Sequence, residues 1–366
     1  MNVVFCAGEA SGDQYAAALV RALPKRPSYI GGIGGRRFLE AGGDLWADSS
    51  AWAAVGILES LKVVPRILPA RNEFLRRLES MPPGVFVPID FGYLNVSLAR
   101  RARELGWKVV YFAPPGSWRR DKQGADLPAV TDAIVTQFSW SQELLWTAGA
   151  NAFWFGHPLV EMLASKPRLE EDARKTIGVL PGSRAHEIEY NLSVIAPAVS
   201  DLGCEIEIAV ASSTTAKVVE EIWHRHGGKA AAFIENDTPG VLGRARAAVV
   251  CSGTATLEAA IQGAPQVVVY RGSKWMEFEY KLRKPKFDYI SLPNILLNRA
   301  VLSELIQHDA SVENVRGLVS ELLPAGGPRS HQLNAYAELA DILGPARGIS
   351  GAADLIMGAN SATRRA

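Results

Sequence analysis

The sequence predicts an α/β protein built from two doubly wound, Rossmann-like halves. Short apolar runs alternate with segments of helical spacing, and this alternation starts twice. It begins with "NVVFCAG" at residues 2–8 and again with "TIGVLPGSR" at residues 176–184. Apolar runs of strand length that alternate with helices are typical of parallel sheets made of βαβ units. The length of 366 residues also favours two domains over one.

In the first half, "NVVFCAG" predicts a buried strand. The next segment, residues 11–25, predicts a helix with Ser11 or Asp13 near its N-cap. The apolar run "SYIGGIGG" then ends in glycines. Further strands are expected over residues 84–90, 108–114, 132–138 and 152–158, with a helix over 91–107.

In the second half, the strand at 176–184 is followed by a predicted helix that ends near Leu202. Further strands are expected over residues 205–211, 230–235, 245–253 and 265–271, with helices between them. The charged, proline-containing segment 162–175 marks the joint. The predicted division is therefore a domain at 1–161, a domain at 162–326 and a helical tail at 327–366. Ligands of open α/β sheets bind at the carboxyl ends of the strands, so we expect the glycine-rich turns of both halves to face a central cleft.

Composition excludes several classes of protein. A net charge of +1 argues against a protein that coats nucleic acid, so no nucleic-acid partner is expected. Cys6, Cys204 and Cys251 are far apart in apolar contexts, which favours reduced, buried thiols in a cytosolic protein. No Cys/His cluster has zinc spacing, so no metal is expected. The N-terminus does not resemble a signal peptide, and no uncharged apolar stretch reaches the roughly 18 residues of a membrane span.

The turn "AGEASGD" at residues 7–13 joins the first strand to the first helix. Such a turn exposes backbone N–H groups, which suit a phosphate or a sugar hydroxyl. Gly8, Glu9, Ser11 and Gly12 are the candidates there. The alternative is that the two glycines only shape the turn, and the spacing does not decide between these interpretations.

The turn "LPGSR" at residues 180–184 repeats this arrangement in the second half. Ser183 is placed to cap the following helix, and Arg184 to bind an anion such as a phosphate. The alternative is that Arg184 pairs with a nearby carboxylate at the surface.

The stretch "CSGTATLEAAIQGAP" at residues 251–265 is the most informative. Ser252, Gly253 and Thr254 follow a buried strand and begin a helix whose N-terminal amides could hold a diphosphate. Glu258 shares a helix face with Thr254, where its carboxylate could accept two ribose hydroxyls. The alternative is an acidic residue that offsets the helix dipole.

Two further residues end strands of the first half. Asp90, in "VPID", is a candidate general base at the carboxyl end of its strand, although spacing alone favours a cap for the next helix. His157, in "FGHP", could contact a substrate or a diphosphate, although a single histidine is more often structural.

The segment 52–77 has apolar residues at helical spacing with basic residues between them. A basic amphipathic stretch can lie on an anionic membrane, and it can equally be an ordinary helix with a solvated face. Pro65 and Pro69 are expected to break it into a short, protruding pair of helices.

Taken in order, these motifs resemble those of the lipid-A-disaccharide synthase family. The resemblance extends from about residue 3 to residue 310. The motifs that carry it are "AGEASGD", "GIGG", "AVGILE", "ID", "GHP", "LPGSR", "SGTATLEAA", "YR" and "SLPN". Each is weak alone, and their order is specific.

The resemblance implies a GT-B glycosyltransferase of lipid A biosynthesis that inverts the donor anomeric centre. It would join UDP-2,3-diacylglucosamine to 2,3-diacylglucosamine 1-phosphate through a β(1→6) linkage and release UDP, with no cofactor and no metal. Positioned charge would stabilise the departing diphosphate. The resemblance also implies a peripheral protein on the inner face of the bacterial inner membrane, and a possible homodimer with exchanged C-terminal segments.

Carried over residue by residue, the resemblance makes Asp90 the base for the acceptor hydroxyl. It assigns the UDP and donor site to Ser183, Arg184, Ser252, Gly253, Thr254, Glu258, Arg271 and Asn294. It assigns the acceptor-side loop to Gly8, Glu9, Ser11 and Gly12, with His157 nearby. It assigns membrane contact to Val55, Leu58, Leu61 and Ile67 within the amphipathic region.

This chain departs from the family pattern at residues 88–95 and 113–123, both in the predicted acceptor half. Two other functions therefore stay open. One is a GT-B enzyme that uses a UDP-sugar on another lipid acceptor. The other is a catalytically silent relative that binds UDP or lipid.

Overall fold

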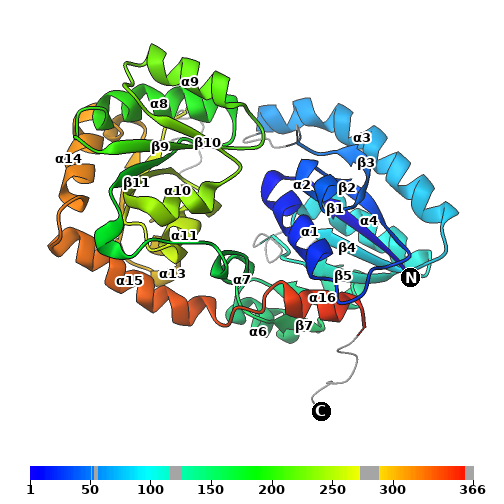
Figure 1. Cartoon of the computed structure of the whole chain (residues 1–366). Coiled ribbons are helices and arrows are strands. Elements are labelled where there is room, and N and C mark those ends of the chain that lie inside the picture. Colours follow the sequence, from blue (N-terminus) through cyan, green and yellow to red (C-terminus); the bar gives the residue numbers. More distant parts are fainter. Residues whose placement is uncertain (51, 53–56, 116–125, 273–287, 359–366) are drawn as a thin grey trace. The chain divides into compact units, whose positions relative to one another are not determined.

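The computed structural model describes residues 1–50, 52, 57–115, 126–272 and 288–358 (Figure 1). The chain forms two compact units. Unit 1 comprises residues 1–162 and the described residues from 343 onward, and unit 2 comprises residues 163–342. Each unit has its own parallel sheet, which confirms the prediction of two doubly wound α/β halves.

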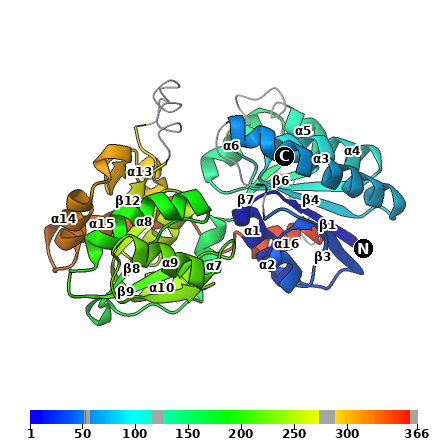
Figure 2. The same cartoon turned by 90° about the horizontal axis from the view of Figure 1, so that it is seen from above.

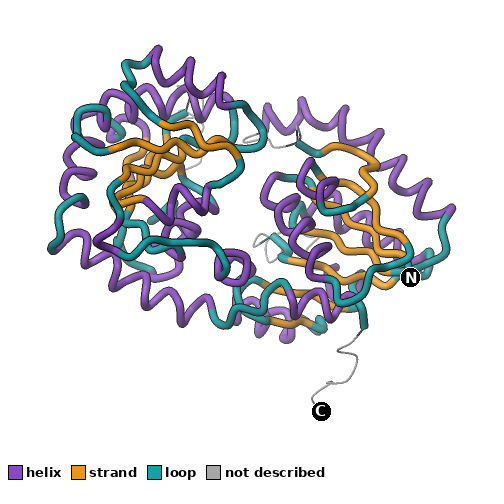
Figure 3. The backbone as a smooth tube through the Cα atoms, viewed as in Figure 1, coloured by secondary structure: helices purple, strands orange, loops and turns teal. Residues whose placement is uncertain are grey.

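The sheet of unit 1 has seven parallel strands in the order β3-β2-β1-β4-β5-β6-β7 (Figure 3). They are β1 (Asn2–Ala7), β2 (Tyr29–Gly34), β3 (Asp44–Asp48), β4 (Val85–Ile89), β5 (Lys108–Phe112), β6 (Ala133–Thr136) and β7 (Ala152–Trp154). The order reverses beside β1, because β2 pairs with one edge of β1 and β4 with the other. Such a reversal is where open α/β sheets bind ligands.

Helices cover both faces of this sheet, as Figure 2 shows. They are α1 (Ala10–Ala22), α2 (Arg36–Glu40), α3 (Ile57–Ser80), α4 (Gly92–Glu104), α5 (Leu127–Val130), α6 (Ser139–Thr147) and α16 (Ser350–Ile356), with α7 (Pro158–Ala164) at the joint. One face carries α3, α4, α5 and α6 over a single apolar core, and α1 and α16 pack together on the other.

The sheet of unit 2 has six parallel strands in the order β10-β9-β8-β11-β12-β13. They are β8 (Thr176–Leu180), β9 (Glu205–Val210), β10 (Ala232–Glu235), β11 (Ala245–Cys251), β12 (Gln266–Tyr270) and β13 (Ser303–Ile306). Its helices are α8 (Ala185–Val199), α9 (Ala216–Arg225), α10 (Thr238–Arg244), α11 (Thr254–Ile261), α13 (Leu292–Leu297), α14 (Val312–Leu322) and α15 (Gly327–Leu343). Short 3₁₀ turns lie at η3 (Glu171–Ala173) and η4 (Gln307–Asp309). The strand order again reverses beside the first strand of the unit, here β8.

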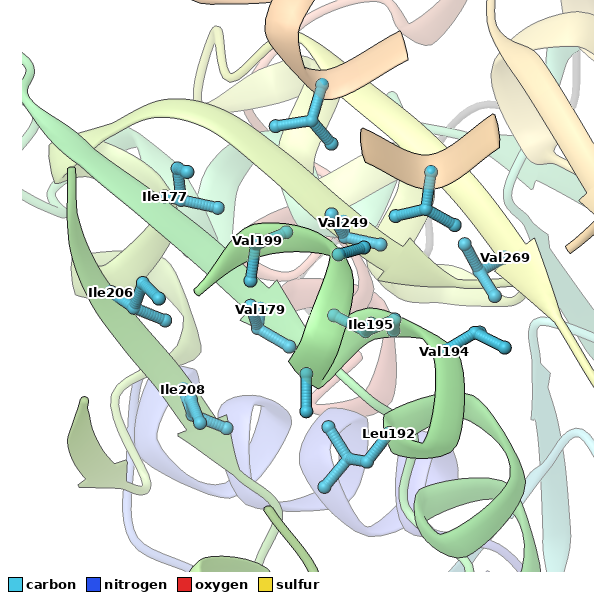
Figure 4. Packing of buried hydrophobic residues seen from close by; sticks show 14 of the residues in the cluster. Ile177, Val179, Leu192, Val194, Ile195, Val199, Ile206, Ile208, Val249 and Val269 are labelled. Atoms are coloured by element: carbon cyan, nitrogen blue, oxygen red, sulfur yellow. The ribbon is translucent and has the colours of Figure 1, made fainter. Parts of the chain in front are cut away.

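The larger core of unit 2 lies between its sheet and the helices α8, α9 and α14 (Figure 4). Alternate residues of β8, such as Ile177 and Val179, point into it, as the period of two in a strand requires. From α8, Leu192, Ile195 and Val199 meet them at spacings of three and four residues. A smaller core on the opposite face holds α10 and α11.

The first helix begins earlier than predicted. Its N-cap residue is Glu9, so Ser11 and Asp13 lie within the helix and neither caps it. The Asp13 carboxylate instead accepts the N–H groups of Gly35 at 2.7 Å, Arg37 at 3.0 Å and Phe38 at 3.0 Å. Asp13 thereby stabilises the start of α2, a neighbour in space rather than in sequence.

The prediction that Pro65 and Pro69 divide the amphipathic segment is wrong, because both lie inside one continuous helix, α3. Four residues apart, they share an exposed face, where water can solvate the carbonyls that lose their helical donors. Burial of Phe74 and Leu78 on the other face anchors the helix.

The segment predicted as a tail, residues 327–366, divides between the units. Arg329 of α15 is buried in unit 2, where it pairs with Glu171 and donates to the carbonyl oxygens of Arg246 and Leu322. Beyond residue 342 the chain returns to unit 1. There the Glu161 carboxylate accepts the N–H groups of Ile349 at 2.7 Å and Ser350 at 3.0 Å, at the start of α16.

The three cysteines are free thiols, with Cys6 and Cys251 buried and Cys204 partly buried. Among the described helices, none is long and apolar enough to cross a membrane. In the same part of the chain, no group of three or more His, Cys, Asp or Glu side chains is placed to hold a metal ion.

Replacing Glu161 with alanine should destabilise unit 1, because two N–H groups at the start of α16 lose a charged acceptor. We expect a loss of about 1–2 kcal/mol. Glu40→Ala is the matched control, since Glu40 forms only an exposed pair with Arg36. Thermal and urea unfolding of both variants measure the difference. An equal effect of the two substitutions would contradict the role given to Glu161.

Candidate active site

The candidate site of unit 1 lies where its strand order reverses. Ala7 at the end of β1 pairs with Ile89 at the end of β4. The turn that contains Gly8 and Glu9 therefore lies beside the turn that starts with Asp90. The structure thus brings together two of the motifs that the sequence predicts on the acceptor side.

Asp90 does not cap the next helix. Helix α4 begins at Gly92, and its N-cap residue is Phe91. The Asp90 carboxylate accepts the adjacent N–H of Phe91 at 2.8 Å. Asp90 and Phe91 both have left-handed backbone conformations, with φ of 47° and 49°. Consecutive non-glycine residues in this region are uncommon and are typical of functional sites.

The environment of Asp90 raises the pKa of its carboxyl group from 3.8 to about 6. Burial is the main cause, because it disfavours the charged carboxylate, and the nearby negative charge of Glu9 adds to it. The hydrogen bond from the Phe91 N–H acts in the opposite direction. A carboxyl group with such a pKa is largely ionised at neutral pH and still basic enough to take a proton.

The glycines of the first turn serve close packing. A Cβ atom at Gly8 would lie 2.3 Å from the ring of Phe91. One at Gly12 would lie 3.3 Å from the Cβ of Ala7, where α1 approaches β1. The structure therefore favours the interpretation that both glycines shape the turn, with Gly8 making room for the residue that follows Asp90. Ser11 is partly buried in the first turn of α1.

His157 is buried, and burial lowers the pKa of its imidazole to about 4. Its Nδ1 accepts the N–H of Leu159 at 3.3 Å, and its ring lies 5.2 Å from that of Phe138. A neutral imidazole offers no positive charge at pH 7, so these contacts support a structural role rather than the predicted contact with a diphosphate.

In unit 2 the strand order reverses between β8 and β11, and the two predicted nucleotide motifs follow these strands. Each motif contains a glycine in the left-handed region, with φ of 117° at Gly182 and 143° at Gly253. A Cβ atom at Gly182 would also lie 2.8 Å from the Glu187 side chain. The structure thus places both turns at the same edge of one sheet, as the sequence predicts.

Arg184 makes the contact that the alternative interpretation expected. Its guanidinium pairs with the Glu187 carboxylate at 2.5 Å. The same carboxylate, which is buried, accepts the N–H groups of Ser183 at 3.2 Å and Arg184 at 3.3 Å. Arg184, not Ser183, is the N-cap residue of α8. An internal carboxylate therefore already occupies the amides that were predicted to bind an anion.

The start of α11 is different. Its first turn contains no acidic residue. Within the described part of the chain, no hydrogen bond joins the N–H groups of Thr254 or Ala255 to an acceptor. Ser252 donates its hydroxyl to the carbonyl oxygen of Ile290 at 3.0 Å, which fixes the turn. Glu258 is buried in the next turn of the helix. Of the two helices that follow the predicted nucleotide motifs, α11 therefore offers the better anion site at its start.

Asn294 has a structural role instead of the predicted contact with the donor. Its Nδ2 donates to the carbonyl oxygen of Leu302 at 3.0 Å and to Glu304 at 2.8 Å. Its Oδ1 accepts the N–H groups of Val301 at 2.8 Å and Leu302 at 2.9 Å. The side chain is fully buried, and internal bonds use both its donors and its acceptor.

Sequence reasoning missed the buried Asn191. Its Nδ2 donates to the carbonyl oxygen of Pro181 at 2.9 Å, and its Oδ1 accepts the N–H of Arg271 at 2.9 Å. Asn191 thus joins the turn after β8 to the end of β12, where Arg271 lies. The sequence feature that could have indicated this role is a single asparagine among the apolar residues of α8.

The predicted membrane contacts divide into three groups. Val55 lies outside the described residues. Leu58 and Leu61 lie in α3, and their side chains are also outside the description. Ile67 is partly buried and packs against the core of unit 1, so only part of its side chain is left for the predicted membrane contact. Its neighbour Leu68 is 50% exposed.

Comparison with known proteins identifies the family. The lipid-A-disaccharide synthetase family matches residues 3–333. The lipid-A-disaccharide synthase of Koribacter versatilis is 32% identical over 369 residues, which cover 97% of this chain and 96% of that protein. The chain belongs to the lipid-A-disaccharide synthetase family.

Solved structures agree with the GT-B fold expected for this family. The co-structure of Staphylococcus aureus MnaA with UDP has a TM-score of 0.64 at 12% identity, covering 99% of this chain and 97% of that one. The calicheamicin glycosyltransferase CalG4 has a TM-score of 0.56 at 16% identity and covers 99% of both chains. At such identities the likeness shows the fold alone.

Replacing Asp90 with asparagine should stabilise this family member at neutral pH. The pKa of the Asp90 carboxyl in the folded protein, about 6, lies above the ordinary value of 3.8. The stability that the protonated carboxyl contributes is therefore fully present below pH 3.8 and is lost as the pH rises through 6. Asparagine avoids that loss and keeps an acceptor for the Phe91 N–H. We expect a gain of at most about 3 kcal/mol at pH 7.

The gain should shrink at pH 4, where the wild-type carboxyl is mostly protonated. Thermal unfolding at both pH values measures the gain, with Asp126→Asn as the control, because Asp126 forms an exposed ion pair with Arg100. A gain that does not depend on pH would contradict the elevated pKa.

Proposed function

We propose that this protein transfers diacylglucosamine from UDP-2,3-diacylglucosamine to the 6-hydroxyl of 2,3-diacylglucosamine 1-phosphate. The products are lipid A disaccharide 1-phosphate, with a β(1→6) linkage, and UDP. The observation that carries the proposal is family membership, with 32% identity to a lipid-A-disaccharide synthase across 97% of the chain. The geometry around Asp90 supports the mechanism.

In this mechanism Asp90 is the general base. Its carboxylate takes the proton of the acceptor hydroxyl as that oxygen attacks the anomeric carbon of the donor. The attack comes from the face opposite UDP, so the bond to the diphosphate oxygen breaks with inversion and the electron pair leaves with UDP. A carboxyl group with a pKa of about 6 suits a base that works near neutral pH.

The start of α11 is the proposed diphosphate site of unit 2. The N–H groups of Thr254 and Ala255 and the positive end of the helix dipole would stabilise the charge that develops on the leaving group. Glu258 remains the candidate for the ribose hydroxyls. Arg184 would contribute positive charge while it stays paired with Glu187, 2.5 Å away. We propose that no cofactor takes part, because positioned N–H groups and one guanidinium would stabilise the departing diphosphate.

Membrane attachment and dimer formation are parts of the same proposal. Pro65, Arg66, Leu68 and Pro69 are exposed on α3, and they combine apolar area with a positive charge. Such a face suits an anionic lipid surface, in keeping with a peripheral protein on the inner face of the bacterial inner membrane. In the proposed homodimer, the segment beyond residue 342 would exchange between chains. No nucleic-acid partner is proposed.

The direct test is turnover. Purified protein is mixed with both substrates, and UDP and disaccharide are followed by mass spectrometry. Disaccharide together with UDP is the expected result. UDP without disaccharide would indicate another acceptor, and bound UDP without turnover would indicate a silent binder.

Asp90→Asn should reduce kcat by about 100-fold or more, because the base is lost, and should leave UDP affinity unchanged. Asp126→Asn, at an exposed site on the same unit, is the control. Full activity of Asp90→Asn would remove Asp90 from the mechanism.

Glu9→Gln should move the acid limb of the kcat/KM profile to lower pH. The wild-type limb reports the pKa of Asp90, and loss of the neighbouring negative charge lowers that pKa toward 3.8. The shift should be partial, since burial is the larger cause. Glu104→Gln at the exposed end of α4 is the control. An unmoved limb would show that Glu9 does not set the pKa of Asp90.

A further inference from the structure

The turn at Asp90 and Phe91 has a left-handed backbone, and this conformation is strained at Phe91. Asp90 and Phe91 have φ values of 47° and 49°, and neither residue is glycine. For side chains other than those of glycine, asparagine and aspartate, this region carries a steric cost. Such a turn persists only where its surroundings fix it.

Two buried side chains fix the carbonyl group of Asp90. The Tyr111 hydroxyl, from β5, donates to the carbonyl oxygen at 2.7 Å. The Asn95 Nδ2, from α4, donates to the same oxygen at 2.8 Å. Both side chains are fully buried. The carbonyl therefore has two donors that come from different elements of unit 1.

Asn95 extends this arrangement to the neighbouring strands. Its Nδ2 also approaches the carbonyl oxygens of Ile89 at 3.0 Å and Cys6 at 3.2 Å. These are the last residues of β4 and the next-to-last of β1, the two strands at which the sheet order reverses. Carbonyl oxygens only accept hydrogen bonds, so the donating nitrogen of the Asn95 amide must point toward all three of them. This fixes the orientation of the amide.

The neighbouring elements also have backbone hydrogen bonds of their own. Helix α4 has its own first backbone bond, from the Asn95 N–H to the Phe91 carbonyl oxygen at 3.2 Å. The Asp90 N–H donates to the Phe112 carbonyl oxygen at 3.1 Å and continues the pairing of β4 with β5. What the two side chains add is the direction of the peptide group after Asp90, and with it the direction of the Asp90 side chain.

We propose that Asn95 and Tyr111 are positioning residues for the transfer reaction: by donating to the Asp90 carbonyl oxygen, they hold the left-handed turn that presents the Asp90 carboxylate to the acceptor hydroxyl. This inference rests on the proposed function of Asp90. Gly8 completes the arrangement, because it leaves room for the Phe91 ring.

Tyr111→Phe is the test variant, since it removes one hydroxyl and keeps the buried ring. It should lower kcat by about 10- to 100-fold, because a catalytic group displaced by about 1 Å can lose that much. The KM values of both substrates should change by less than about 3-fold, since Tyr111 is proposed to act on the base and not on substrate binding. Asn95→Ala would remove the donor of three buried carbonyls at once, so it serves only as a second variant.

Tyr29→Phe is the matched control. Its hydroxyl also bonds within the sheet of unit 1, to Asp44 at 2.5 Å and to Trp46 at 2.7 Å, at the opposite ends of the strands. Loss of stability without loss of kcat is expected there. If Tyr111→Phe and Tyr29→Phe lower stability alike and both keep wild-type kcat, the proposal is overturned.

A second measurement does not depend on turnover. Carbon-13 labelling of aspartate allows the Asp90 carboxyl to be titrated by NMR, with Asp90→Asn to assign its signal. In Tyr111→Phe we expect the midpoint to move from about 6 toward 3.8, as the released carboxylate gains solvent. An unmoved midpoint would overturn the positioning role. If the wild-type protein makes no disaccharide, the proposed function is wrong but the positioning role is still tested. The titration alone decides whether Tyr111 holds Asp90.

Discussion

In each unit the strand order reverses beside the first strand, and this reversal determines where the polar turns of the chain meet. A parallel strand is followed by a crossover that carries the chain to one side of the sheet. At the reversal the crossovers diverge, so the turns after two adjacent strands are left side by side. The turns after β1 and β4 meet in this way in unit 1, and those after β8 and β11 in unit 2.

The two meeting points use carboxylates in opposite ways. In unit 1, Asp90 is buried and lies near the like charge of Glu9, so the neutral form is favoured and the pKa rises to about 6, although the hydrogen bond from the Phe91 N–H acts in the opposite direction. In unit 2, the buried Glu187 receives two N–H groups and a guanidinium. The first carboxylate is the proposed base, whereas the second fixes a turn through its hydrogen bonds. Burial alone therefore does not identify a base, since hydrogen-bond donors around a buried carboxylate favour its charged form.

Much of the fold could be predicted from the sequence, because strand length and helical spacing are local properties. The two sheets and the motif turns at their edges follow from such patterns, and so does the family. Predictions failed where packing in the folded protein changed the local outcome. Pro65 and Pro69 continue a helix because Phe74 and Leu78 anchor it in the core. Asn294 is not free for a ligand because Glu304 and the backbone at 301–302 already use its amide.

By itself the sequence determined the two doubly wound units, the order of the motifs and the presence of an aspartate at the end of the fourth strand. Only the tertiary structure decided which of these groups are available for chemistry. Tyr111 reaches Asp90 from 21 residues away, and Asn191 reaches Arg271 from 80 residues away. The physical reason is that a pKa, a strained φ angle and the occupancy of an N–H group are set by whatever packs against them in space, and spacing along the chain does not record those neighbours.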